Sequence, residues 1–208
     1  MRIITGSAKG RKIKIPKVGT IRPAQDKVRQ AVFSMLYGLV EGSHVLDLFA
    51  GSGSYGLEAL SRGAKNVIFV DINKRCTETI KENLRALGFG SKGEVIKEDA
   101  QRFVERYSGT SPNELGQVKE TLRVKESAEL QSDKATHSEK FNLIFLDPPY
   151  EMGTQTHLLK SLTKILAPKG VIIFSHAKET KIPEETNGLK VIRERSYGAT
   201  TVSFLAKS

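Results

Sequence analysis

The 208-residue chain has little of what marks several common classes of protein. It has no tryptophan. It has only one cysteine, Cys76, so no internal disulfide can form. No apolar run reaches the ~18 residues of a membrane-spanning helix, and residues 1–6 lack the apolar core of a signal peptide. We therefore expect a protein of the reducing cytoplasm that contacts no membrane.

Metal ligands are also missing as a pattern. The four histidines are scattered, and no Cys/His cluster has the spacing of a metal site. We expect no bound metal. Cys76 follows the expected start of a helix near Asn73, and we expect it to pack in the core rather than act as a nucleophile.

Positive charge is concentrated at the start of the chain. Residues 1–30 hold nine lysines and arginines against one acid, Asp26, a net charge of +8, whereas the other 178 residues carry only +2. Such a segment is typical of a surface that binds a polyanion, although a solvated basic tail is the alternative. The candidate nucleic-acid contacts are Arg2, Lys9, Arg11, Lys12, Lys14, Arg22 and Arg29.

This basic segment has the pattern of a hairpin. Residues 2–5 favour a strand, residues 12–15 alternate lysine with isoleucine, and residues 7–10 form a turn-like sequence between them. We therefore predict a basic hairpin or arm over residues 1–22, able to lie along a nucleic-acid backbone, and a single domain over residues 23–208.

That domain alternates strands with helices. We predict strands at 44–49, 66–71, 93–97, 141–147 and 170–175, with helices from Pro23 and at 54–62, 73–88, 100–107 and 155–167. This alternation predicts an α/β fold with a mostly parallel sheet covered by helices on both faces. Two further strands, 189–195 and 200–207, are joined by a short turn and predict an antiparallel C-terminal edge, which makes seven strands.

Residues 108–140 interrupt this alternation. They contain no Phe, Tyr or Trp, and they are rich in Ser, Thr and Gln with nearly balanced charge. A connection of this length without a core pattern is unusual in a compact domain. We expect a polar, mobile insertion, with a role as a lid or an RNA clamp as an open possibility.

A glycine-rich turn follows the first strand. Residues 45–56 predict a buried strand, a turn and the start of a helix, where the backbone admits a ligand closely and the helix N-terminus favours anionic oxygens. Twenty residues after Gly51, the next strand ends in Asp71, a position suited to ribose hydroxyls. The pattern fits both dinucleotides and S-adenosylmethionine.

Asp47 distinguishes these cofactors, since a carboxylate four residues before Gly51 would repel a pyrophosphate and suit the ammonium group of a methionine tail. Asp99, after the third strand, is placed to accept from an adenine amino group. Each acid alone is also typical of a solvated loop or a helix N-cap, and a nicotinamide cofactor remains the alternative. The expected S-adenosylmethionine contacts are Asp47, Phe49, Gly51, Ser52, Gly53, Gly56, Asp71, Ile72, Asp99 and Ala100.

The segment Asp147-Pro148-Pro149-Tyr150 follows the buried strand 141–146. Its prolines leave two peptide units without N–H donors, so carbonyl oxygens and the Asp147 carboxylate are available as acceptors. Tyr150 offers a face for stacking on a base, worth ~1–3 kcal/mol. The group suits a planar exocyclic amino group, and a plain strand-ending loop is the alternative.

Seven blocks of sequence stand in the order and spacing of a known family. They are Arg2-Ile3-Ile4-Thr5-Gly6, Gly10-Arg11-Lys12, Arg22-Pro23-x-x-Asp26-x-Val28-Arg29, Phe33-x-x-Leu36, Asp47-Leu48-Phe49-Ala50-Gly51-Ser52-Gly53, Gly56-Leu57-Glu58-Ala59-Leu60-Ser61-Arg62-Gly63-Ala64 and Asp147-Pro148-Pro149-Tyr150. In these blocks the chain resembles the RsmD family of bacterial small-subunit ribosomal RNA guanine methyltransferases. The resemblance covers nearly the whole chain outside 108–140.

The resemblance implies a seven-stranded Rossmann-like class I methyltransferase fold, S-adenosylmethionine as donor and a guanine exocyclic amino group of ribosomal RNA as acceptor. It implies catalytic roles for Asp147, Pro148 and Tyr150, in direct methyl transfer to a base turned out of its helix. The chain departs from the family pattern at Ala24, Gln30 and Ser175-His176 and in the length of 108–140. We expect a monomer that acts on an assembling small subunit.

Other functions fit parts of the sequence. A protein-glutamine methyltransferase would use a similar acceptor site but would not need the basic hairpin. A methyltransferase acting on adenine or cytosine amino groups, in DNA or RNA, fits both features on charge alone. An RNA-binding protein without activity would keep the hairpin but has no use for Asp147, Tyr150 and the glycine turn together.

Overall fold

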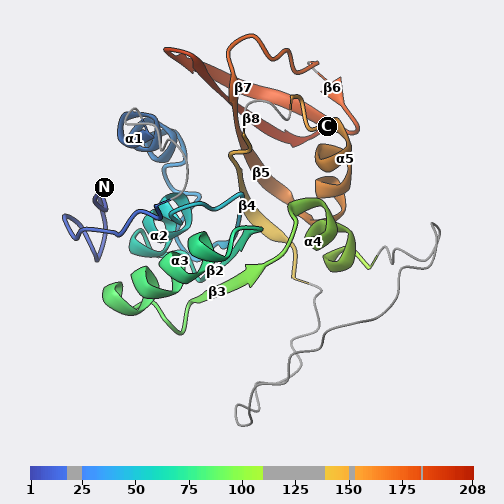
Figure 1. Cartoon of the computed structure of the whole chain (residues 1–208). Helices are drawn as coiled ribbons and strands as arrows, with labels where there is room; N and C mark the ends of the chain where they lie inside the picture. Colours follow the sequence, from blue (N-terminus) through green and yellow to red (C-terminus); the bar gives the residue numbers. More distant parts are fainter. Residues whose placement is uncertain (18–24, 110–138, 150–152, 184) are drawn as a thin grey trace.

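The computed structural model describes residues 1–17, 25–109, 139–149, 153–183 and 185–208. Across these residues one sheet of eight strands runs through the molecule (Figure 1), in the order β3-β2-β1-β4-β5-β8-β7-β6. The strands are β1 (His44–Leu48), β2 (Asn66–Asp71), β3 (Gly93–Lys97), β4 (Phe141–Leu146), β5 (Leu166–Ala177), β6 (Glu185–Thr186), β7 (Leu189–Tyr197) and β8 (Thr200–Lys207).

The sheet has a parallel part and an antiparallel part. Strands β1 to β5 pair in parallel, whereas β8 pairs antiparallel with β5 and β7. The predicted α/β class, mostly parallel sheet and antiparallel C-terminal edge are therefore confirmed. The strand count is eight rather than seven, because β6 is a two-residue strand that pairs with Leu189 and Lys190. So short a strand leaves no apolar alternation in the sequence.

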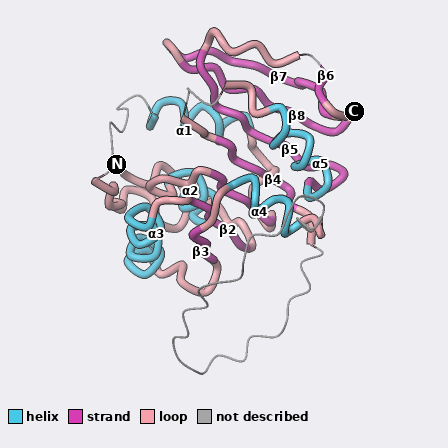
Figure 2. Tube along the Cα trace, turned by 45° about the vertical axis from the view of Figure 1, so that its right-hand side comes forward, coloured by secondary structure: helices cyan, strands magenta, loops and turns pink. Residues whose placement is uncertain are grey.

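Helices cover both faces of the sheet, as predicted. In Figures 1 and 2, α1 (Gln25–Met35), α2 (Ser54–Ser61) and α3 (Lys74–Leu87) lie on one side, and α4 (Ala100–Tyr107) and α5 (Thr156–Ile165) lie on the other. Each side has its own buried cluster. In β1, Val45 belongs to the first cluster and Leu46 and Leu48 to the second, as the two-residue period of a strand requires. Asp47, between them, therefore faces α2.

The N-terminal residues form a hairpin. Arg2 pairs with Lys12 in an isolated antiparallel bridge, and the Gly10 N–H donates to the Ile3 carbonyl at 2.9 Å. The side chains of Ile3, Ala8 and Ile13 are buried in the cluster that contains α2 and α3. We call residues 1–17 the basic hairpin. It is folded onto the domain, whereas the sequence also allowed a projecting arm.

Parts of the predicted hairpin and of the predicted insertion lie outside the described residues. Residues 18–22, the end of the predicted hairpin, are not among the described residues, and neither are 110–138 of the predicted insertion. On one side of that insertion, Ser108 ends α4 and donates its N–H to the Val104 carbonyl at 2.9 Å. None of the helices that the structure describes is both long and apolar enough to cross a membrane.

Candidate cofactor and acceptor site

Three acidic residues, Asp47 of β1, Asp71 and Asp147, lie at the carboxyl ends of neighbouring parallel strands. Strand β1 lies between β2 and β4, and Leu48 is paired with Val70 on one side and with Leu146 on the other. Asp71 ends β2, and Asp147 follows the last residue of β4. The two carboxylates therefore flank the glycine turn that follows β1, at the edge where open α/β sheets bind ligands.

The glycine turn is held in an unusual backbone conformation. Phe49, Gly51 and Gly53 have φ angles of 56°, 55° and 76°, in the left-handed region that suits glycine. A Cβ at Gly56 would lie 2.2 Å from Cε1 of Phe69, so α2 packs on β2 only because this position has no side chain. A Cβ at Gly51 would meet nothing closer than 3.9 Å. The backbone at Gly51 is therefore open to a ligand.

Asp71 is bound to the glycine turn. Its Oδ2 accepts from the Gly51 N–H at 2.8 Å and its Oδ1 accepts from the Asn73 N–H at 2.8 Å. Beside it, the side chain of Ile72 is 66% exposed, although it is a large apolar group. A half-buried carboxylate next to an exposed apolar side chain matches a ribose with its attached base.

Cys76 lies behind this carboxylate. Burial raises the pKa of its thiol to about 11, with smaller contributions from the charge of Asp71 and from the hydrogen bond to it. The thiol is therefore neutral at physiological pH, as expected for a packing residue rather than a nucleophile.

Asp47 lies deeper than the sequence suggested. Its residue is 2% exposed, and its Oδ2 accepts from the Gly56 N–H in α2 at 2.9 Å. Burial raises the pKa of this carboxyl well above its usual range, and the charges of Asp147 and Asp71 raise it further, although the Gly56 hydrogen bond lowers it. The side chain therefore points from β1 toward α2 and is buried beside the glycine turn.

Asp99 caps α4. Its Oδ1 accepts from the Arg102 N–H at 3.1 Å, which satisfies one free donor of the helix N-terminus. Ala100, the first residue of α4, is buried. The helix-cap alternative therefore holds for Asp99, and this role leaves its second carboxylate oxygen for any ligand.

The acceptor segment is described as far as Pro149. Asp147 is half-buried, Pro148 is buried and Pro149 is exposed, whereas Tyr150 lies outside the described residues. The predicted role of Tyr150 therefore stays a prediction. Asp147 lies close enough to both Asp47 and Tyr55 for its charge to raise their pKa values.

Tyr55 is a further polar side chain at this site, and the sequence patterns did not indicate it. Its ring stacks on Phe145 of β4, with centroids 5.0 Å apart and an interplanar angle of 22°. Burial, followed by the charge of Asp147, raises its pKa, and the Ser175 hydroxyl hydrogen bonds to it. Its phenol therefore stays protonated beside Asp147. A tyrosine in the first turn after a glycine-rich segment was the available signal.

Ser175 and His176 point to opposite faces of β5. Ser175 reaches Tyr55, whereas His176 packs against Phe174 on the other face. The Nε2 atom of His176 lies 2.9 Å from the Ser203 hydroxyl, which donates to Glu194 at 2.7 Å. His176 thus takes part in a hydrogen-bond network across β5, β8 and β7, on the face of β5 opposite to Ser175.

The basic hairpin presents exposed cations. Arg2, Lys9, Arg11, Lys12 and Lys14 are all exposed. Arg11 hydrogen bonds to the carbonyls of Ala86 and Leu87 at the end of α3, and the Lys14 ammonium lies 2.8 Å from Glu82. Arg22, the next predicted contact along the chain, is outside the described residues.

Arg29 differs from the other predicted nucleic-acid contacts. Its side chain is 1% exposed. One nitrogen donates to the Arg2 carbonyl at 2.6 Å, and others lie 3.1 Å from Asp26 and 4.0 Å from Glu58. This arginine holds the basic hairpin to α1 and α2, so it is not part of the exposed basic surface.

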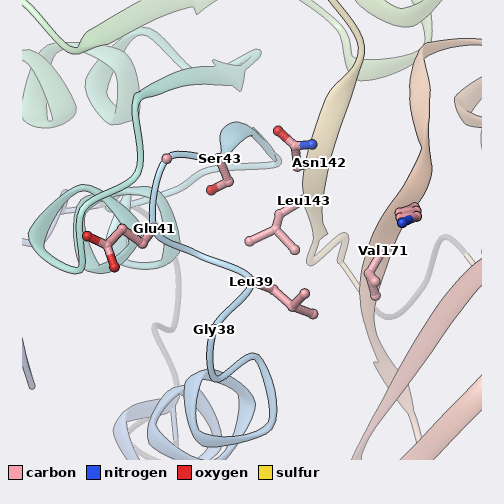
Figure 3. A pocket seen from close by; sticks show the side chains of 9 residues that line it. Gly38, Leu39, Glu41, Ser43, Asn142, Leu143 and Val171 are labelled. Carbon is pink, nitrogen blue, oxygen red and sulfur yellow. The ribbon is translucent and has the colours of Figure 1, made fainter.

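A pocket of about 230 Å³ lies near the amino-terminal ends of strands β1 and β4 (Figure 3). It is lined by Leu39, Ser43, Asn142, Leu143, Val171 and neighbouring residues. Asn142 is at the start of β4 and Asp147 follows its end, so this pocket does not belong to the site. Among the residues that the structure describes, no three His, Cys, Asp or Glu side chains are grouped as metal ligands.

The sheet order and the glycine turn define a class I methyltransferase fold. The structure of HI0767 from Haemophilus influenzae has the same fold, with a TM-score of 0.71 and 26% identity over 99% of this chain and 97% of that one. In sequence, the chain is 34% identical to YlbH of Bacillus subtilis, over all of this chain and 99% of that protein. It is 31% identical to ribosomal RNA small subunit methyltransferase D of Escherichia coli, over 95% and 85%.

The family model described as Conserved hypothetical protein 95 matches residues 1–115 and 110–206, and the chain belongs to that family. Together with the relatives named methyltransferase D, this match confirms the resemblance to the RsmD family that the sequence blocks indicated. The match extends across the basic hairpin, the glycine turn and the acceptor segment.

Proposed function

We propose that the protein is an S-adenosylmethionine-dependent methyltransferase that modifies the exocyclic amino group of a guanine in small-subunit ribosomal RNA. The observation that carries the proposal is the convergence of Asp47, Asp71 and Asp147 on one open glycine turn. Three carboxylates within electrostatic range of each other favour a ligand with positive charge and disfavour a pyrophosphate.

S-adenosylmethionine fits this charge pattern, because its sulfonium and ammonium groups are cationic, and it supplies a methyl group on an activated sulfur. In the proposed complex, Asp71 holds the ribose and exposed Ile72 packs against the adenine. The open backbone at Gly51 admits the methionine part. Asp47 acts through its charge and through the Gly56 N–H that it fixes, and Asp99 and Ala100 lie at the adenine side.

The acceptor nitrogen is held by Asp147 and the Pro148 carbonyl. A guanine amino group conjugates its lone pair with the ring, and these two acceptors would hold its N–H bonds out of plane. The methyl group then moves from sulfur to nitrogen in one displacement, and a proton leaves the nitrogen afterwards. Tyr150 stacks on the base. The hydrogen-bonded hydroxyl groups of Tyr55 and Ser175 lie beside Asp147. Positioning supplies most of the acceleration.

Ribosomal RNA is the proposed partner because of the basic hairpin. Its exposed cations, Arg2, Lys9, Lys12 and Lys14, lie on a segment that packs against α2 and α3. A protein-glutamine methyltransferase would not need this surface. The relatives named ribosomal RNA small subunit methyltransferase D support the same acceptor, and we propose that a monomer acts on the assembling subunit.

An acceptor screen tests this proposal. Purified protein is incubated with methyl-labelled S-adenosylmethionine and, separately, with small-subunit ribosomal RNA, assembling small subunits, duplex DNA and a protein extract freed of nucleic acid. The proposal predicts label in the RNA of the first two samples. Label in DNA or protein would support the rival methyltransferases, and no label with tight RNA binding would support a binding protein without activity.

A further inference from the structure

Asn83 of α3 joins the basic hairpin to the glycine turn. Its side-chain Oδ1 accepts from the Lys14 N–H at 2.8 Å, and its Nδ2 donates to the Lys14 carbonyl at 3.0 Å. The same Nδ2 donates to the Ser52 carbonyl at 3.3 Å. Ser52 lies between Gly51 and Gly53, so one side chain connects three segments that are distant in sequence.

The position of Asn83 makes these bonds important. The residue is 2% exposed, and a buried amide that loses its partners leaves polar groups unsatisfied. With Lys14 it pairs as a neighbouring strand would, one donor and one acceptor to the same residue. A further contact joins the same two segments, since the Ser52 hydroxyl lies 3.8 Å from the Met1 sulfur.

A second buried side chain fixes the hairpin to α2. Glu58 is 0% exposed, and its carboxylate accepts from the N–H groups of Ile4 at 2.7 Å and Thr5 at 3.0 Å. Helix α2 begins directly after the glycine turn. The basic hairpin is therefore bound to both α2 and α3, and Asn83 is a buried side chain that bonds the hairpin and the turn at the same time.

The charged end of this connection is exposed. The Lys14 side chain is 70% exposed and pairs with Glu82, which is itself 50% exposed. An RNA phosphate can therefore compete with Glu82 for the Lys14 ammonium. Such a contact would restrain the Lys14 backbone, whose N–H and carbonyl are both bound to Asn83.

We propose that Asn83 is a positioning residue that couples RNA binding on the basic hairpin to cofactor binding at the glycine turn. This inference rests on the proposed function, because it takes RNA and S-adenosylmethionine as the two ligands. RNA on the hairpin stabilises the arrangement in which Asn83 holds Ser52, so each ligand increases the affinity for the other. Coupling between two ligands is reciprocal and is typically ~5–150-fold.

The test measures the dissociation constant of S-adenosylhomocysteine by calorimetry, with and without saturating small-subunit ribosomal RNA. The ratio of the two constants is the coupling. We expect a ratio of about ten in the unmodified protein, and a ratio near one in Asn83→Ala. Thr77→Val is the matched control, because Thr77 is also buried in α3, and within the described part of the chain its hydroxyl bonds only to Lys74 of the same helix. It should keep the unmodified ratio.

Asn83→Asp is the second variant, should Asn83→Ala fail to fold. It keeps the acceptor for the Lys14 N–H but has no N–H for the carbonyls of Lys14 and Ser52, so it should also lose the coupling. A ratio of one in the unmodified protein, or an unmodified ratio in both Asn83 variants, would overturn the inference while both ligands still bind. Failure of the unmodified protein to bind either ligand would instead overturn the proposed function and the inference with it.

Discussion

The carboxylate of Asp71 at the end of β2 accepts a hydrogen bond of 2.8 Å from the backbone N–H of Gly51 in the turn after β1. This bond ties the predicted ribose acceptor to the predicted cofactor turn. A ligand that binds the Gly51 backbone must therefore also meet Asp71. Substitution at Asp71 should affect cofactor affinity both directly and through the shape of the turn.

We predict that Asp71→Ala weakens binding of S-adenosylhomocysteine by about 1–3 kcal/mol, the cost of losing hydrogen bonds to a charged group. Asp71→Asn should be milder, since an amide oxygen still accepts from Gly51. Calorimetry checks both, with Glu179→Ala, at an exposed position after β5, as the control. Tight binding of NAD, without binding of S-adenosylhomocysteine, would show that the cofactor assignment is wrong.

The thiol of Cys76 should react slowly with disulfide reagents at pH 8, because the thiolate is the reactive form and the pKa is raised to about 11. The rate should rise with pH until that value. Asp71→Asn should accelerate the reaction at pH 8, since it removes a charge that raises the pKa. A thiol-release assay over about pH 7–11 measures this, and a rate that levels off near the ordinary ~8.5 would contradict it.

The same shift affects stability at high pH. A thiol with a raised pKa in the folded state contributes stability that is present below the ordinary value of ~8.5 and is lost as pH rises toward the folded value. For Cys76 the window is therefore from about pH 8.5 up to about pH 11. Cys76→Ser should reduce the dependence of the thermal midpoint on pH within that window.

Asp47→Asn should stabilise the ligand-free protein at neutral pH. Because the pKa of Asp47 is raised in the folded protein, this group contributes stability at pH values below the ordinary pKa of an aspartate. That contribution is lost as pH rises through the folded pKa. An asparagine still accepts from Gly56 and carries no buried charge. A stabilisation of ~1 kcal/mol would raise the midpoint by about 2–4 °C.

The same variant should bind S-adenosylmethionine less tightly, because it removes one of three carboxylates that favour a cation. Differential scanning calorimetry and binding measured together test this trade-off. The stabilisation should be larger at about pH 8 than near pH 4, where the carboxyl is protonated in the folded protein. An equal gain at both pH values would show that the charge of Asp47 is not its cause.

The basic hairpin should contribute to the salt dependence of RNA binding. Lys9→Ala with Lys12→Ala should weaken binding and lower the slope of affinity against salt by about 0.7–0.9 for each phosphate that the two lysines neutralise. Folding should be unaffected, since both side chains are exposed. Lys160→Ala, at an exposed lysine on α5, is the control. An unchanged slope in the double variant would mean that the hairpin does not meet the RNA backbone.

Charge removal is the better test of the hairpin than deletion of residues 1–20. Such a deletion would also remove Ile3 and Ile13 from the core and leave the buried carboxylate of Glu58 without two donors. Loss of folding would then hide any effect on RNA.

Local patterns predicted the sheet well. The strands at 44–49, 66–71 and 93–97 differ from β1, β2 and β3 by at most one residue at an end, because apolar runs bounded by glycines and acids are strong signals. Strand β5 begins at Leu166, four residues earlier than predicted. Leu166 pairs with Phe141 across a register shift, and a pairing between distant residues leaves no local pattern.

The sequence predicted which candidate residues lie at the ends of the strands, but it did not predict how deeply each is buried. The turn glycines and Asp71 could be selected because spacing alone places them at strand ends. The burial of Asp47 and Arg29 could not, since each depends on a helix or hairpin that packs from elsewhere in the chain. Likewise, the hydrogen bonds that Asn83 and Glu58 make to the basic hairpin and the glycine turn join residues more than 30 positions apart. No local periodicity in the sequence can predict such bonds.

Nucleoside analysis of ribosomal RNA, after single-turnover reaction with labelled S-adenosylmethionine, can detect methyl transfer to a guanine amino nitrogen held by Asp147. We expect label only on the exocyclic nitrogen of guanosine, and a rate at least ~10²-fold lower in Asp147→Ala with cofactor binding nearly intact. Label on adenine or cytosine, or near-normal turnover in Asp147→Ala, would contradict it.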